Sequence, residues 1–214
     1  APIAVIPEIG GPSMSLTWIS DIRTWLAPQQ GDDGISLLAD TLREVMPGGG
    51  TLGLPMGHET HVRMPAADYQ RLQSQLEGIS IADGTDVVRS LRMVKSPSEI
   101  AKIARICSIA SAAFEDLPNH IRAGDTERQA FAKFKIDLLQ KGADDVPYLV
   151  GSSGPGGFSD VINRPTDRVI TDGDMLLLDT GSLWGGYSCD FDRNYAFGHA
   201  SDEAKTAYDL AWRA

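Results

Sequence analysis

The most constraining feature of this sequence is a predicted β-hairpin near the C-terminal end of the chain. Met175–Leu178 is an unbroken apolar run, typical of a buried strand, and it ends at Asp179. A bend at Trp184-Gly185, beside Gly186, suits the conformational freedom of glycine. Because directly opposed residues of an antiparallel pair share a face, this bend predicts that Asp179 faces Asp190.

Two carboxylates placed in this way create a charge problem. Opposed Cβ atoms lie roughly 4.5–5.5 Å apart, so ionised Asp179 and Asp190 repel unless a shared proton, a basic side chain or a metal ion offsets the charge. Hard divalent cations bind carboxylate oxygens, and a facing pair can bridge two ions roughly 3.5–4 Å apart. The same register places Asp192 on this face, opposite Leu177, and leaves Arg193 as the alternative source of compensating charge.

Composition argues against several other functions. The 214 residues include 29 acidic and 19 basic side chains, a net charge of −10, which argues against a nucleic-acid partner. No apolar segment is long enough to cross a membrane. The two cysteines, Cys107 and Cys189, argue against a disulfide scaffold and a thiolate zinc site. Without a leader sequence we expect a cytoplasmic protein, and the Ala1-Pro2 start without Met indicates processing or truncation.

We expect two domains, residues 1–94 and 95–214. The first alternates strands and helices, with Leu38, Leu42 and Val45 on the buried stripe of one helix. Its expected strands are residues 3–6, 51–54 and 79–82, and its expected helices are residues 35–45, 65–76 and 83–94.

The second domain begins with a strong helix signal. Ser96 suits the N-cap, Pro97 the first helical position and Glu99 a capping box. This helix is expected to reach about Leu117 with Ile100 among its apolar positions. The other expected elements are a helix from Thr126 to Gly142 with Leu139 on its buried side, strands over residues 147–151, 167–170, 175–179 and 187–197, and a helix from Ser201.

Other candidate sites are weaker. Gly151–Gly157 lacks the Gly-Lys-Ser/Thr ending of a phosphate loop, and we expect a mobile loop there. His58 and His61 are one residue too close for the His-Glu-x-x-His zinc motif, and we expect both to be solvated. His120 is expected only to complement a helix dipole, and neither it nor His199 has an evident carboxylate or serine partner.

Three segments resemble one known family. Asp172–Gly181 and Gly186–Arg193 resemble the creatinase, prolidase, aminopeptidase P and methionine aminopeptidase group, and Arg92–Ile100 resembles the junction between two domains of that group. The resemblance covers the whole chain. It implies an α/β fold, with a partial creatinase-type N-terminal domain over residues 1–94 and the first half of a pita-bread catalytic domain over residues 95–214.

The resemblance also implies a metal centre and a reaction. The family peptidases bind two divalent ions (Mn, Co, Zn or Fe) through two Asp, one His and two Glu. Asp179 and Asp190 match the two Asp, and the other ligands would lie beyond Ala214, so no catalytic residue is assigned. A metal-dependent, homodimeric hydrolase is implied, of the Xaa-Pro aminopeptidase or dipeptidase type, which cleaves a small peptide or amide with a metal-activated water. A fragment cut at both ends is expected to bind metal weakly and to be inactive by itself.

Two departures from the family pattern keep alternatives open. Family peptidases carry a histidine where this sequence has Ile162-Asn163, and no histidine lies between residues 121 and 198. A creatinase-type C–N hydrolase without metal, or a catalytically inactive pita-bread binding module, is therefore the alternative. Asp192 stands where the family usually has a small hydroxyl residue, and it either tunes the metal centre or pairs with Arg193.

Overall fold

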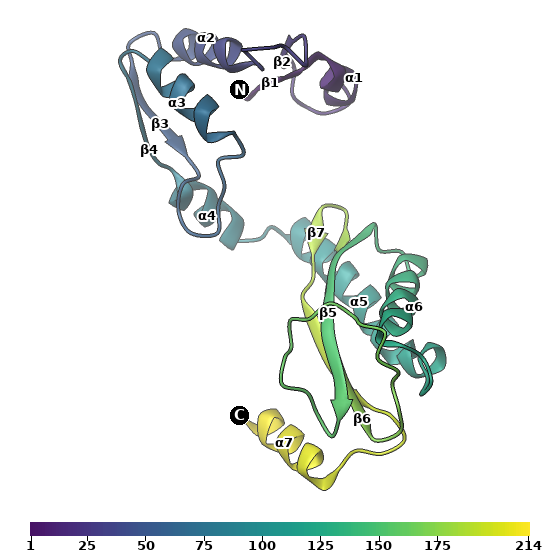
Figure 1. The fold of residues 1–214 in the computed structure, drawn as a ribbon. Helices are drawn as coiled ribbons and strands as arrows, with labels where there is room; N and C mark the ends of the chain where they lie inside the picture. The colour runs from purple at the N-terminus through teal and green to yellow at the C-terminus, as the bar shows by residue number, and fades with distance from the viewer. The chain divides into compact units, whose positions relative to one another are not determined.

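The computed structural model describes residues 1–214 and divides into two compact units, residues 1–94 and 95–214 (Figure 1). A separate cluster of buried apolar side chains lies in each unit. Compactness alone does not make either unit an independently folding domain, so the domain assignment stays a prediction. None of the helices combines the length and the apolar character that a membrane crossing requires.

Two parallel strand pairs organise the first unit. Its elements in chain order are β1 (Ile3–Pro7), a 3₁₀ turn (Glu8–Gly10), α1 (Gly11–Met14), β2 (Asp21–Trp25), α2 (Ile35–Val45), β3 (Gly50–Leu54), α3 (Ala66–Gln75), β4 (Ile79–Asp83) and α4 (Thr85–Met93). β1 pairs with β2, and β3 pairs with β4. The core of this unit is formed mainly by α2, α3 and β4, through Ile35, Ala39, Leu72, Leu76 and Ile79.

Most predicted elements of this unit are present. α2 has the predicted bounds, although Val45, predicted on its buried stripe, is half exposed. α4 begins two residues later than predicted, because the carboxylate of Asp83 accepts a hydrogen bond from the Thr85 amide at 2.9 Å and caps the helix from outside. α1 and β2 were not predicted. The polar sequence of β2 becomes a strand through its pairing with β1.

The second unit is an antiparallel sheet covered by two helices. Its elements are α5 (Pro97–His120), α6 (Glu127–Gln140), β5 (Asp145–Pro155), β6 (Asp174–Trp184), β7 (Tyr187–Ser188), β8 (Phe191–Ala196) and α7 (Asp202–Arg213). β6 is central: β5 pairs with one edge, and β7 and β8 pair in succession with the other. Figure 1 shows α5 and α6 on the same side of this sheet.

Both long helices begin at capping boxes, of which the one at Ser96 was predicted and the one at Thr126 was not. Ser96 Oγ accepts from the Glu99 amide at 3.4 Å, and Glu99 Oε2 accepts from the Ser96 amide at 2.6 Å. Thr126 and Gln129 form the second box in the same way. These local signals fix where α5 and α6 start, and therefore which of their faces meet the sheet.

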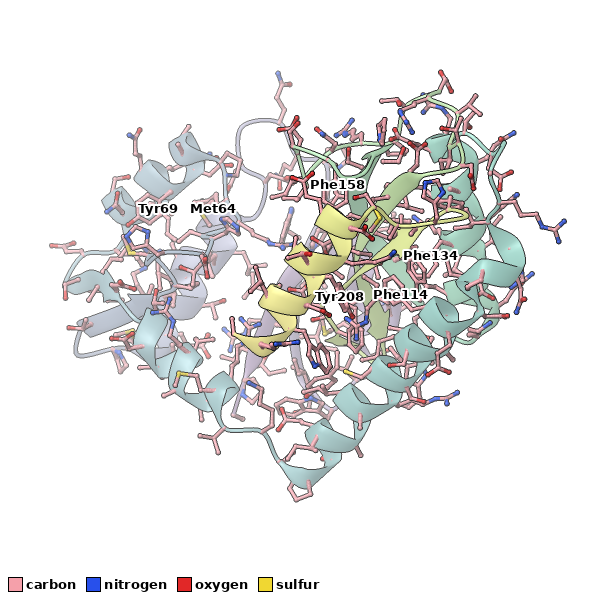
Figure 2. The ribbon with its side chains drawn as sticks, turned by 90° about the horizontal axis from the view of Figure 1, so that it is seen from below. Met64, Tyr69, Phe114, Phe134, Phe158 and Tyr208 are labelled. Atoms are coloured by element: carbon pink, nitrogen blue, oxygen red, sulfur yellow. The ribbon has the colours of Figure 1, made fainter.

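The core of the second unit lies between these helices and one face of β6. Phe114 of α5 and Phe134 of α6 lie side by side in Figure 2, with ring centroids 4.6 Å apart. Leu176 and Leu178 of β6 are fully buried in the same cluster. The alternate residues of β6, Asp179 among them, therefore point to the face away from α5 and α6.

Several predictions for this unit are wrong. Residues 167–170 are not a strand and contribute only one bridge, between Val169 and Thr126. The segment predicted as a mobile loop belongs in large part to β5, which continues to Pro155. Ile100 and Leu139, predicted on buried faces, are 56% and 41% exposed, and neither belongs to the buried cluster of this unit.

Candidate metal centre

A tight turn sets the register of the hairpin. Gly185 and Gly186 both have positive φ, 56° and 83°, as a two-residue type I′ hairpin turn requires. Leu183 pairs with Ser188 and Trp184 with Tyr187. The predicted bend at Trp184-Gly185 is therefore wrong by one residue, because both glycines, not one, occupy the turn.

This turn shifts every predicted pair by two residues. Asp179 lies opposite Asp192, and Leu177 lies opposite Asn194 instead of Asp192. Cys189 N donates to Ser182 O at 3.1 Å, so the same register continues between β7 and β8 and places Asp190 across from Gly181. The two predicted metal ligands, Asp179 and Asp190, are thus diagonal neighbours on one face, with Asp192 beside them.

Tyr148 of β5 determines where the carboxylate of Asp190 lies. Tyr148 pairs with Gly181, and its hydroxyl donates a short hydrogen bond to Asp190 Oδ1. A Cβ atom on Gly181 would lie 2.1 Å from Tyr148 Cε1, so the ring crosses over this glycine to reach Asp190. Burial, and then the hydrogen bond to Asp190, raise the pKa of Tyr148, which keeps the phenol protonated as a donor.

The carboxylate of Asp179 has no partner in the protein. Its Oδ1 atom is buried and makes no hydrogen bond. Burial, and then the charges of Asp190 and Asp192, raise the pKa of Asp179 above its ordinary value. A buried carboxylate oxygen without a donor costs free energy, and a divalent cation bound beside it would remove that cost. The residues present therefore fit a site for a hard metal ion.

Arg193 does not compensate these charges, contrary to the alternative drawn from the sequence. Side chains alternate between the faces of a strand, so Arg193 points away from Asp192. Its guanidinium carbon lies 5.1 Å from the ring centroid of Phe191 and 5.9 Å from that of Phe114, on the helix-covered face. It donates to the backbone carbonyl oxygen of Asp192 at 2.5 Å and not to the carboxylate.

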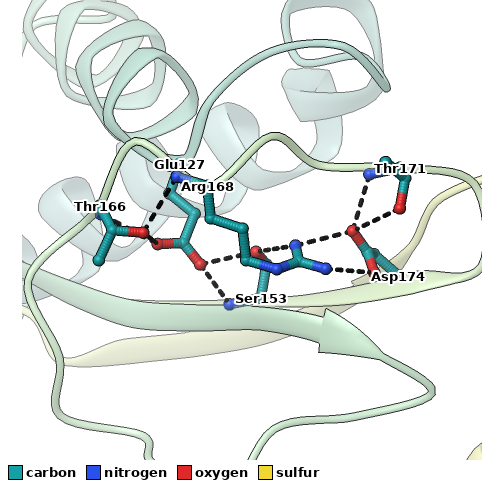
Figure 3. Close-up of polar contacts among 6 residues, drawn as sticks. All are labelled: Glu127, Ser153, Thr166, Arg168, Thr171 and Asp174. Carbon is teal, nitrogen blue, oxygen red and sulfur yellow. Dashed lines mark hydrogen bonds and ion pairs between the residues drawn. The ribbon is translucent and has the colours of Figure 1, made fainter.

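A buried polar network that was not predicted from the sequence anchors the segment before β6 (Figure 3). Glu127, at the start of α6, is only 4% exposed and accepts from the amide and hydroxyl groups of Ser153 and Thr166 at 2.6–2.9 Å. Burial raises the pKa of Glu127, but these hydrogen bonds outweigh it and hold the pKa below its usual value. α6, β5 and the connecting segment are thereby joined through one carboxylate.

Arg168 continues this network to β6. Its guanidinium binds both oxygens of the fully buried Asp174 at 2.8 Å and also donates to Ser153 Oγ at 2.8 Å. Farther back along the same segment, the carbonyl oxygen of Asn163 accepts from the Gly151 amide at 3.1 Å. The position of the expected family histidine, Ile162-Asn163, is therefore next to β5 but offers no imidazole.

A second group of possible ligands lies between α5 and α6. Asp116, His120 and Asp137 offer ligand atoms within 4.8 Å of one another, and Asp137 Oδ2 is buried without a partner. Lys141 Nζ already binds Asp116 Oδ2 at 2.8 Å and Asp137 Oδ1 at 2.7 Å, which supplies a cation to this group. His120 thus has carboxylate neighbours that the sequence did not reveal, with Asp116 at 3.1 Å.

The remaining histidines give no catalytic arrangement. His199 Nδ1 lies 3.4 Å from the carboxylate of Asp172, so it too has a partner that was not predicted, but both side chains are largely exposed. His58 and His61, predicted to be solvated, are in an exposed turn region of the first unit.

Comparison with known proteins agrees with the fold. The model of metallopeptidase family M24 matches residues 101–214. The chain is 26% identical over 219 residues to a probable dipeptidase PepE of Mycobacterium bovis, covering 100% of this chain and 55% of that protein. It is 29% identical over 135 residues to an Xaa-Pro dipeptidase of Pyrococcus horikoshii, covering 60% and 37%. The chain thus spans about half the length of the dipeptidase that matches all of it.

A solved structure gives the same picture. The Xaa-Pro dipeptidase from Bacillus anthracis superimposes with a TM-score of 0.80 at 23% identity, over 98% of this chain and 56% of that one. The predicted fold class, α/β with part of a pita-bread domain, is confirmed. On the match of the family model to more than half of its residues, the chain belongs to metallopeptidase family M24.

Proposed function

We propose that the full-length protein is a metal-dependent hydrolase that cleaves a small peptide with Pro near its N-terminus, with Asp179 and Asp190 as metal ligands. The observation that carries this proposal is the unpartnered, buried Oδ1 of Asp179 beside a second carboxylate, with no basic side chain to neutralise them. The names of two relatives, both Xaa-Pro dipeptidases, support the substrate class.

The chain's own residues prepare this site. Two divalent ions of the Mn, Co, Zn or Fe type would, when bound, supply hydroxide near neutral pH and polarise the carbonyl that is attacked. Asp179 offers its oxygens from the rigid central strand β6, and Tyr148 fixes the orientation of the Asp190 carboxylate through its hydroxyl. Orientation of a ligand by a neighbouring donor commonly changes metal affinity or activity by about 10–100-fold. We also propose a cytoplasmic homodimer, in keeping with the family resemblance.

The experiment compares hydrolysis of Xaa-Pro dipeptides by the full-length protein before and after metal removal. Activity should be lost with EDTA and restored with Mn²⁺, and Asp179→Asn and Asp190→Asn should each lower kcat/KM at least about 100-fold. Asp209→Asn removes one charge from an exposed position on α7 that has no hydrogen bond or ion pair, and it should leave activity unchanged. Activity that is insensitive to EDTA and to both site variants would contradict the proposal.

One observation favours the alternative that the protein is a metal-independent C–N hydrolase of the creatinase type. Ile162-Asn163 replaces the histidine expected of family peptidases, and the segment that carries it is anchored to β5. Metal-independent hydrolysis of a small C–N substrate, with no Xaa-Pro cleavage, would select this alternative. Specific peptide binding without turnover, metal present or absent, would select the inactive binding module.

A further inference from the structure

Asp192 is the carboxylate that the proposed metal centre does not yet explain. The observed register places it directly opposite Asp179, on the face away from α5 and α6. Its carboxylate makes no hydrogen bond and no ion pair, and the neighbouring guanidinium of Arg193 lies on the other face. Asp192 is therefore a third carboxylate without a basic partner, beside Asp179 and Asp190.

This placement is unfavourable without a cation. Like charges directly opposite each other on a sheet destabilise the pair, and the carboxylates of Asp192 and Asp179 are in this arrangement. An exposed carboxylate alone is ordinarily solvated. Here, however, Oδ1 of Asp179 is buried with no donor, so the opposed pair has one oxygen that water does not reach. A bound divalent ion would satisfy that oxygen and offset the repulsion together.

We propose that Asp192 is a third carboxylate ligand of the metal centre formed by Asp179 and Asp190. This inference rests on the proposed function and adds to it the metal class. An additional carboxylate makes the ligand set harder and more negative, which favours ions that prefer oxygen ligands, such as Mn²⁺, over Zn²⁺. Asp190, two residues before Asp192 on the same face, accepts a hydrogen bond from Tyr148, whereas the carboxylate of Asp192 accepts none within the protein and keeps its oxygens available for an ion.

The test measures metal affinity, not turnover. The full-length protein is freed of metal and titrated calorimetrically with Mn²⁺ and, separately, with Zn²⁺. Asp192→Asn and Asp192→Ser should weaken Mn²⁺ binding at least tenfold and Zn²⁺ binding by a smaller factor. The matched control, Asp209→Asn, changes net charge by the same amount at an exposed position on α7 and should stay within twofold of wild type. Thermal unfolding of the metal-free proteins checks that the variants fold.

A repeat at 1 M salt separates ligation from a general effect of charge. The Debye length there is about 3 Å, so an influence that acts only through space is largely screened. The weakening caused by Asp192→Asn should persist. If it disappears at 1 M salt, or if Asp192→Asn binds Mn²⁺ as tightly as wild type while Asp179→Asn abolishes binding, Asp192 is not a ligand and the proposed function stands. If Asp179→Asn also binds normally, the proposed metal centre itself is wrong.

Discussion

At the scale of single residues, Gly181 and Tyr148 together position one carboxylate of the candidate site. The glycine is buried in the central strand, and the tyrosine ring occupies the space that a side chain there would need. No pattern in the sequence links these two positions, which are brought together by the pairing of β5 with β6. That Asp179 and Asp190 could bind a metal ion could be predicted from their residue type. That Tyr148 donates a hydrogen bond to Asp190 could be seen only in the fold.

Gly181→Ala should therefore disturb both stability and the site. The new methyl group would lie 2.1 Å from Tyr148 Cε1, so the ring must leave its place and release Asp190. We expect a loss of about 1–3 kcal/mol in the free energy of unfolding, as for other overpacked positions. Denaturant unfolding measures it. In a Tyr148→Ala background the same substitution should cost little, and an equal cost in both backgrounds would show that the clash is not the cause.

The register error also belongs to the residue scale. A bend at Trp184-Gly185 and a bend at Gly185-Gly186 both use glycine, and the apolar pattern of β6 does not distinguish them. The difference of one residue at the turn moves Asp192, not Asp190, opposite Asp179. A strict preference for two residues with positive φ would have selected the second bend.

At the scale of elements, local capping signals were reliable and nonlocal contacts were not visible. α5 begins at its predicted cap, and α6 begins where a helix was predicted to start, because Ser96 and Thr126 satisfy amide groups within one turn. The wrongly predicted strand at 167–170 is instead held by side chains: Arg168 reaches Asp174 and Ser153, while Thr166 reaches Glu127. Its apolar residues have the pattern of a strand. Its conformation, however, depends on hydrogen bonds to residues between Glu127 and Asp174, which are almost fifty positions apart in the sequence.

Glu99 links a helix cap to the hairpin and should give a measurable pH dependence. Hydrogen bonds from Ser96, and then one from the Tyr187 hydroxyl at 2.8 Å, lower the pKa of Glu99 from 4.5 to about 2. Since the pKa is lower in the folded state, the ionised carboxylate stabilises the fold above pH 4.5, and this contribution is lost as the pH falls toward 2.

Glu99→Gln tests this directly, because glutamine can still complete a capping box but does not titrate. The variant should be less stable than wild type at pH 7, and the difference should shrink steadily between about pH 5 and pH 2. Denaturation midpoints measured across that range give the comparison. A difference that stays constant with pH would mean that Glu99 acts through its shape and not through its charge.

At the scale of the whole molecule, the fold class could be predicted from the family resemblance. The contacts around the candidate site, such as the hydrogen bond from Tyr148 to Asp190, could not be predicted from composition or from resemblance. The acidic balance of 29 against 19 describes the chain as a whole, yet three carboxylates without a basic partner are concentrated on one face of one sheet. Two buried carboxylates elsewhere have basic partners: Asp174 pairs with Arg168 and Asp137 with Lys141. This contrast supports the proposal that a cation binds at the unpaired face.

A metal ion bound at that face should stabilise the folded protein, because the ligands come together only in the fold. For the full-length protein, Mn²⁺ at about 100 times its Kd should add about 2.7 kcal/mol to the free energy of unfolding. EDTA should remove this increment, and Asp179→Asn should not gain it, while Asp209→Asn should gain it in full. Calorimetric unfolding with and without Mn²⁺ provides the measurement. If the ion stabilises Asp179→Asn as strongly as wild type, it binds elsewhere, and the group of Asp116, His120 and Asp137 becomes the next site to mutate.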